Sequence, residues 1–193
     1  MSLTYFTPGD TLWFCGRGFA SRAIGLWTTS LKQKWNGQLI SHGSFIAPHR
    51  GKIKNFESTT FNDLACDEAR RKVLGVQVND PHKRVLTYTG RVYLSRPRNA
   101  LKAEQVEALS NSARAFLGTP YDMPGALRAG TRWIKRFFDA DPSALFCDEF
   151  MAFALMDCGK IPEGSFNPSA VTPAWLARWL VHNAVYQPLV RLK

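Results

Sequence analysis

The chain has 193 residues, of which 45% are hydrophobic and 21% are charged, and its formal net charge is +10. This length and composition indicate one globular domain over residues 1–193, with two smaller domains as the alternative, and they exclude a low-complexity chain. No run approaches the roughly 20 apolar residues that span a bilayer, and the first residues lack the basic and apolar regions of a secretory signal, so we expect a cytoplasmic protein or one released by another route.

The first half of the chain is predicted to be rich in strands. Short runs of apolar, aromatic and β-branched residues, separated by turn residues, predict strands at 10–16, 39–47, 52–58, 72–79, 84–90 and 91–97. The last two are expected to form a hairpin around Gly90. The alternation in 52–58 places Asn55 and Glu57 on one face and Phe56 on the other. Residues 17–35 are weakly helical in pattern.

The second half is predicted to be helical. Apolar stripes at helical spacing, with capping residues at their ends, predict helices within 101–118, 122–138, 146–159 and 171–183. Thr172 and Pro173 are a strong start signal, because a threonine caps the free N–H groups and a proline fits the first helical position. Strands first and helices later favour an α+β fold, with an antiparallel sheet or barrel packed against a helical half.

Neither a disulfide framework nor a metal site is expected from the cysteines and histidines. The four cysteines lie far apart with no CxxC pair, at positions Cys15, Cys66, Cys147 and Cys158. The seven-residue spacing of His42 and His49 is not a usual zinc-ligand spacing. The sequence contains no cofactor motif, so no cofactor is predicted.

Cys147 is the cysteine best placed for chemistry. The start of a helix favours a thiolate, because the free N–H groups and the helix dipole stabilise negative charge there. Cys158 is predicted at the opposite end of the same helix, where the dipole has the wrong sign. The alternative is that Cys147 is a buried core thiol.

His42 is the best candidate for a general base. It lies in an apolar strand beside Gly43, which permits close approach of a substrate or of another backbone. Glu57, on the next predicted strand, is placed to orient the imidazole. His82 and His182 are expected to be exposed, and His49 is expected in a turn. The alternative for His42 is a histidine satisfied within the core.

Six motifs in order carry a resemblance: GDTLWF, SHGSFIA, FES, GVQV, LGTPYD and FCDEF. The chain resembles the circularly permuted branch of the NlpC-type cysteine peptidase superfamily, which includes the YiiX-like proteins and has lecithin retinol acyltransferase as a relative. The resemblance runs from about residue 8 to 180. It implies a permuted papain-like fold with a central cysteine-bearing helix. It also implies Cys147 as nucleophile, His42 as base, Glu57 as its orienting partner, and Tyr121 as a residue that lines the cleft and binds substrate.

Two positions depart from the family pattern. The family commonly has Ser-His-Val-Gly where this chain has SHGSF, so the glycine is shifted by one place. The family has Cys-Ser-Glu-Leu where this chain has CDEF, which places Asp148 directly after the nucleophile. A carboxylate that points at the thiol opposes thiolate formation, so we expect Asp148 to face solvent in the first helical turn.

The resemblance implies a cysteine hydrolase (peptidase or amidase) or an acyltransferase that forms a thioester on Cys147. It suggests peptide, cell-wall peptide, lipid or acyl-amide substrates. The excess of 25 Lys and Arg over 15 Asp and Glu suits an anionic membrane surface, and the basic, aromatic segment 122–138 is a candidate for that contact. Nucleic acid is not expected, because only composition favours it. The alternative function is a non-catalytic papain-like domain that binds an anionic partner through its basic surface.

Overall fold

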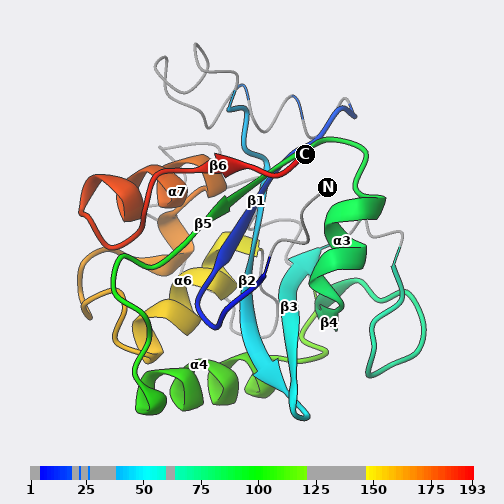
Figure 1. The fold of residues 1–193 in the computed structure, drawn as a ribbon, viewed down its shortest axis with the longest axis horizontal. Helices are drawn as coiled ribbons and strands as arrows, with labels where there is room; N and C mark the ends of the chain where they lie inside the picture. The colour runs from blue at the N-terminus through cyan, green and yellow to red at the C-terminus, as the bar shows by residue number, and fades with distance from the viewer. Residues whose placement is uncertain (1–4, 19–21, 23–25, 27–37, 60–63, 121–146) are drawn as a thin grey trace.

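The computed structural model describes residues 5–18, 22, 26, 38–59, 64–120 and 147–193 (Figure 1). The predicted helix at 122–138 lies outside these residues, as does most of the segment 17–35. Within the described residues, no helix is both long and apolar enough to cross a membrane.

The centre of the fold is a six-stranded antiparallel sheet with strand order β4-β3-β2-β1-β5-β6. Its strands are β1 (Thr11–Cys15), β2 (His42–His49), β3 (Lys52–Thr59), β4 (Gly75–Asn79), β5 (Arg91–Ser95) and β6 (Val190–Arg191). The sheet is open, so the barrel alternative is wrong. The sheet also gains a short strand, β6, from the second half of the chain, which the sequence pattern did not predict.

The turn between β2 and β3 sets the register of the central hairpin. Arg50 and Gly51 both have positive φ angles, of 48° and 73°. Two such residues in a two-residue loop form the tight turn whose twist matches that of the strands. The register therefore runs from His49 opposite Lys52 to Phe45 opposite Phe56.

Four α-helices accompany the sheet in the described part of the chain. They are α3 (Pro81–Thr87), α4 (Ala103–Ala115), α6 (Cys147–Asp157) and α7 (Pro173–His182), and a 3-10 turn, η2 (Pro168–Ala170), precedes α7. The start of α7 is as predicted: the Thr172 hydroxyl accepts a hydrogen bond from the N–H of Trp175, and Pro173 is the first helical residue. Gly159, with a φ of 69°, follows the end of α6.

Residues 84–90 were predicted as a strand, and this prediction is wrong. The segment begins in helix α3, where the Asp80 carboxylate caps the N–H of Lys83 at 2.9 Å and Pro81 occupies the first turn. These two residues are the same kind of start signal as Thr172 and Pro173. The β-branched residues that suggested a strand follow this cap, and the cap decides the local structure. Consequently, no hairpin forms around Gly90.

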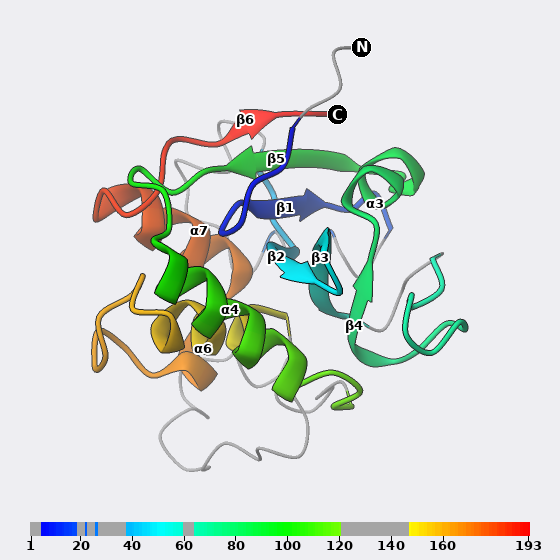
Figure 2. The same cartoon turned by 60° about the horizontal axis from the view of Figure 1, so that its bottom comes forward.

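The two faces of the sheet carry different cores. The larger core joins Trp13, Phe45 and Phe56 of the sheet to Phe150 and Met151 of α6, and α4 and α7 also contribute to it. Helices α4 and α6 lie side by side below the sheet in Figure 2. The smaller core lies on the opposite face, is built from Phe6, Leu12, Phe14, Ile46, Val92 and Leu94, and contacts Val85 and Tyr88 from the α3 region.

Candidate active site

Strands β2 and β3 separate at the end of the hairpin that is remote from their turn. Their pairing ends at Phe45 and Phe56. Beyond that point, β2 continues to His42 while paired with β1, and β3 continues to Thr59 while paired with β4. Beyond Phe45 and Phe56, the ladder does not pair the two strands with each other. Two of the predicted site residues, His42 and Glu57, lie on these segments.

His42 and Glu57 are in direct contact between the two strands. The Nε2 atom of His42 lies 2.7 Å from Oε2 of Glu57. The histidine side chain is 13% exposed, whereas the glutamate side chain is fully buried. The contact expected from the sequence is therefore present, and the imidazole keeps a path to solvent.

Glu57 is held as a carboxylate by its neighbours. Oε1 accepts a hydrogen bond from Nδ2 of Asn79 at 2.8 Å, and Nε of Arg84 lies 2.9 Å from Oε1 and 3.0 Å from Oε2. Burial by itself raises the pKa of Glu57, but the charge of Arg84 and the hydrogen bonds of His42 and Asn79 outweigh it and lower the pKa to about 2. The carboxylate is therefore ionised at neutral pH.

Cys147 is the first described residue of α6, and its thiol lies against the start of β2. The backbone N–H of Gly43 is directed at the sulfur, which lowers the pKa of the thiol. Helix and strand approach closely here because Gly43 has no side chain: a Cβ at this position would lie 2.7 Å from Cε of Met151 in α6. The glycine that departs from the family pattern is thus the residue that the helix contacts.

Asp148 was predicted to face solvent, and this prediction is wrong. Asp148 is 1% exposed, and the Cys147 thiol donates a hydrogen bond to its Oδ1 atom over 3.0 Å. Burial, and next the charge of Asp148, raise the pKa of Cys147 well above its usual range, against the smaller opposing effect of Gly43. The dipole argument for an exposed acid failed because α6 packs its whole first turn against the protein. In this conformation the thiol is protonated.

The thiol and the imidazole approach the strand from opposite faces. The His42 ring packs at a tilt against Phe14 of the smaller core, with ring centres 5.3 Å apart, whereas Gly43 faces Trp13 and Met151 of the larger core. Within the described residues, the thiol contacts Asp148 and Gly43, and no hydrogen bond joins it to His42. Both groups therefore lie at the same strand end without touching.

Two residues of the site were not predicted from the sequence, and one predicted residue lies outside the described part of the chain. Arg84 and Asn79 bind the Glu57 carboxylate, and neither was singled out from the sequence. The Asp80-Pro81 start signal would have revealed the helix that carries Arg84. Tyr121, the predicted substrate-binding residue, lies outside the described residues.

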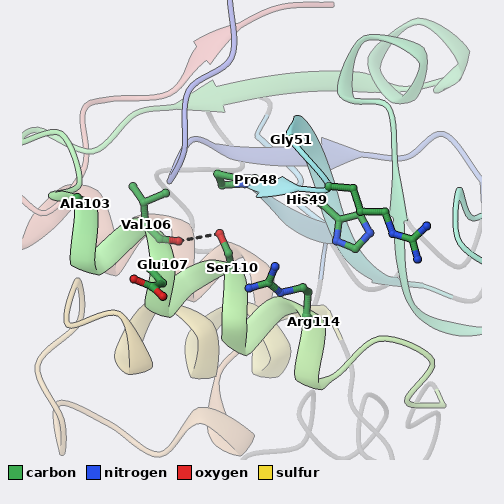
Figure 3. A pocket seen from close by; sticks show the side chains of 9 residues that line it. Pro48, His49, Gly51, Ala103, Val106, Glu107, Ser110 and Arg114 are labelled. Atoms are coloured by element: carbon green, nitrogen blue, oxygen red, sulfur yellow. Dashed lines mark hydrogen bonds between the residues drawn. The ribbon is translucent and has the colours of Figure 1, made fainter.

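A second histidine–glutamate pair lies at the opposite end of β2. His49 is buried rather than in an open turn, and its Nε2 contacts Oε1 of Glu68. A cavity of about 270 Å³ lies beside it, between the β2–β3 turn and α4 (Figure 3). Ser110 and Arg114 of α4 line that cavity. None of the predicted site residues lines this cavity, so it is separate from the His42–Glu57 pair.

The two remaining histidines are not placed for chemistry with Cys147. His182 is exposed at the end of α7, as predicted. His82 was also expected to be exposed, but it is partly buried in α3, where its ring packs at a tilt against Phe6 with 4.9 Å between ring centres. His42 therefore stays the candidate base.

No protein-family model matches the chain, and no curated protein matches its sequence. Among solved structures, the chain is similar to the crystal structure of the metalloprotein YiiX (DUF1105) from Escherichia coli O157:H7. The TM-score is 0.55 and the identity is 17%, over 97% of this chain and 96% of that chain. The likeness extends over the whole chain, and at this identity it shows the fold alone.

Because that neighbour is described as a metalloprotein, we tested whether the described residues suit a metal ion. They contain no group of three or more His, Cys, Asp or Glu side chains that could hold one. The His42–Glu57 pair shares its carboxylate with the Arg84 guanidinium, and the His49–Glu68 pair shares its carboxylate with Arg50. A cation on the carboxylate opposes a metal ion, so the described residues do not fit one.

The open antiparallel sheet, the helices on its faces and the match over both whole chains agree with one another. The permutation and the relation to the NlpC-type superfamily stay predictions. The chain has an α+β, YiiX-like fold.

Proposed function

We propose that this chain is a cysteine-dependent acyl-transfer enzyme, a hydrolase or an acyltransferase that acts on amides or esters through a thioester on Cys147. The observation that carries the proposal is the buried His42–Glu57 pair, 2.7 Å apart, at the strand end where the Cys147 thiol also lies. An imidazole oriented by a carboxylate and a thiol at a helix start are the groups that nucleophilic catalysis requires, and the proposal needs these two groups to come into contact.

The proposed chemistry begins with a proton transfer. Because Glu57 accepts at Nε2 of His42, the other ring nitrogen, Nδ1, is the one that takes the thiol proton. The sulfur then bonds to the carbonyl carbon, and the leaving amine or alcohol departs with the proton from the imidazolium. Water, or another acceptor, releases the acyl group by the same steps. The backbone N–H of Cys147 is the candidate donor to the oxyanion.

The protonated thiol defines the conformation described above as a resting state. Sulfur donates to Asp148 there, so catalysis requires the thiol to exchange Asp148 for His42. The end of the β2–β3 ladder at Phe45 supports such an exchange, since the ladder pairs His42 with β1 and not with β3.

The substrates that we propose are peptides, cell-wall peptides, lipids or acyl amides. The net charge of +10 favours substrates with anionic groups or presented at an anionic membrane surface. Hydrolysis and acyl transfer use the same residues, so the acceptor distinguishes the two reactions.

Site-resolved alkylation tests the proposal. The rate of iodoacetamide modification of each of the four cysteines is measured by mass spectrometry between pH 4 and 10, in the native protein, in His42→Ala and in the control His182→Ala. We expect the alkylation rate of Cys147 to fall at least about tenfold in His42→Ala alone. The buried Cys15, whose pKa burial raises to about 11, is the internal reference. Equal rates for Cys147 in all three proteins contradict the proposal.

Capture of the acyl-enzyme gives a second readout. With p-nitrophenyl acetate, the Cys147 sulfur bonds to the acetyl carbon and p-nitrophenolate leaves, so a burst of nitrophenolate accompanies an acetyl adduct on Cys147. Cys158→Ala, at the other end of α6, is the matched control and keeps the burst. An adduct that persists in Cys147→Ala contradicts a role for this thiol.

The hydrogen bond from Cys147 to Asp148 favours a second candidate, the non-catalytic binding domain, because it opposes thiolate formation. That candidate predicts no burst and no His42-dependent alkylation. It also predicts binding to phosphatidylserine vesicles that disappears at high salt and is unchanged in Cys147→Ala. Comparing the native protein with Cys147→Ala, in the burst assay and in vesicle binding, therefore decides between the two candidate functions.

A further inference from the structure

We infer that Arg84 is a positioning residue of this site: its guanidinium holds the Glu57 carboxylate ionised and in place, so that Glu57 keeps the Nε2 proton of His42 and leaves Nδ1 free. The catalytic consequence rests on the proposed function. The electrostatic part rests only on the contacts of Arg84.

Arg84 neutralises a carboxylate that no solvent reaches. Its Nε atom lies 2.9 Å from Oε1 and 3.0 Å from Oε2 of Glu57, and the two side chains are 4% and 0% exposed. A carboxylate buried without a cation is costly and takes up a proton instead. Without Arg84, burial therefore dominates, and the pKa of Glu57 rises from about 2.

Two aromatic rings fix the position of the guanidinium. The Arg84 Cζ atom lies 4.7 Å from the ring centre of Phe14 and 5.2 Å from that of Tyr88. Such contacts favour a cation over a neutral side chain. Phe14 also packs against the His42 ring, with ring centres 5.3 Å apart. The cation and the imidazole are thus packed against the same ring of β1.

Helix α3 positions the Arg84 side chain against the sheet. The Arg84 N–H donates to the carbonyl of Asp80 over 2.9 Å, and the N–H of Tyr88 donates to the carbonyl of Arg84 over 3.3 Å. The cap at Asp80 and the proline at its start hold this short helix between β4 and β5. Arg84 faces the sheet, whereas its neighbour Lys83 is exposed.

The hydrogen bonds around Glu57 determine the histidine tautomer. Oε1 accepts from Asn79 and Oε2 accepts from Arg84, so both oxygens already serve as acceptors. An ionised carboxylate has no proton to give, so the contact with His42 requires a proton on Nε2. A protonated Glu57 permits the opposite tautomer, in which Nδ1 carries the proton and cannot accept one.

Nuclear magnetic resonance of the whole protein tests this inference without any substrate. The Cδ shift of Glu57 and the ring-nitrogen shifts of His42 are followed against pH in the native protein, in Arg84→Met and in the control Lys83→Met. We expect the Glu57 titration to move to higher pH and the Nε2-protonated tautomer of His42 to decrease in Arg84→Met only. Identical titrations in the two methionine variants overturn the inference.

Alkylation of Cys147 tests the catalytic consequence. We expect Arg84→Met to slow the His42-dependent reaction about tenfold at pH 6, with a smaller loss at pH 8 as Glu57 regains its charge. Arg84→Lys, which keeps the charge, restores most of the rate and provides a folded variant if Arg84→Met does not fold. In a Glu57→Gln background, Arg84→Met has no further effect; an equal loss in both backgrounds shows a merely structural role and overturns the inference.

The proposed function and the proposed role of Arg84 can each be disproved independently of the other. If Cys147 shows no His42-dependent reaction in the native protein, the proposed function fails, and the Glu57 titration still decides the electrostatic role of Arg84. If Cys147 does react but Arg84→Met leaves its pH profile unchanged, only the role of Arg84 is wrong.

Discussion

At the scale of single residues, Cys147 is subject to two opposing influences. The Gly43 N–H stabilises a thiolate, whereas burial and the Asp148 charge stabilise the thiol. Burial and the Asp148 charge outweigh the Gly43 N–H and raise the pKa of the thiol, so a helix start alone does not make this cysteine reactive. The residue that follows Cys147 is therefore decisive, because in this chain it is an acid that accepts the thiol hydrogen bond.

Replacing Asp148 by serine is expected to increase the reactivity of Cys147. The substitution removes the nearest negative charge, and each pKa unit by which the thiol falls increases the thiolate fraction tenfold at a pH well below the pKa. We expect the alkylation rate of Cys147 at pH 7 to rise by about tenfold or more in Asp148→Ser. Asp157→Ser, which removes an exposed acid at the end of α6, is the control. An unchanged rate in a folded Asp148→Ser protein shows that Asp148 does not restrain the thiol.

At the scale of elements, the site depends on the close approach of α6 to β2. A Cβ at Gly43 would lie 2.7 Å from Cε of Met151 and 3.0 Å from the Trp13 ring. The methionine methyl ends a flexible side chain, but Trp13 is fully buried and its Nε1 donates to the Thr11 hydroxyl over 3.0 Å. The close contact between α6 and β2 therefore requires a glycine at position 43.

Gly43→Ala is expected to destabilise the fold and to displace the Cys147 end of α6. Forcing one extra methyl into a packed interface costs roughly 1–3 kcal/mol. The free energy of urea-induced unfolding measures the loss. Gly18→Ala is the control, because no atom lies within 4 Å of a Cβ built there. If both variants have the stability of the native protein, the helix and strand are not as closely packed as described.

At the scale of the whole molecule, the charge of Glu57 links the sheet to helix α3. The carboxylate is supplied by β3, Asn79 ends β4, and Arg84 lies on α3. The pKa of Glu57 is about 2 in the folded protein, below the ordinary value of 4.5. A lowered pKa stabilises the folded state above pH 4.5, and this contribution disappears as the pH falls from there toward 2.

The stability of the molecule is therefore expected to decrease on acidification in a way that depends on Glu57. The gap between the two pKa values corresponds to on the order of 3 kcal/mol at neutral pH. We expect the difference in unfolding free energy between the native protein and Glu57→Gln to be largest at pH 7 and to shrink below pH 4.5. Glu163→Gln, in an exposed turn, serves as the reference. A difference that stays constant from pH 7 to 2.5 is incompatible with an ionised, buried Glu57.

Local patterns predicted five of the six strands and the helices α4, α6 and α7, because alternation, turn residues and caps act between neighbours in the chain. For residues 84–90 the same local rules gave a wrong prediction of a strand, because the Asp80-Pro81 start signal of α3 was not recognised. In the candidate site, the contact between His42 and Glu57 could be expected, since adjacent antiparallel strands bring such residues together. The catalytic roles of His42, Glu57 and Cys147 stay predictions.

The α+β class, five strands, three helices and the placement of His42 and Glu57 on neighbouring strands all follow from the sequence. Three features appear only in the three-dimensional fold: the sheet edge at β6, the Arg84 cation on Glu57, and the burial of Asp148 against the thiol. Each of these depends on segments far apart in the chain or on which side of a helix is packed. Local propensity carries no information about contacts made at such distances, and packing overrides it where the two conflict.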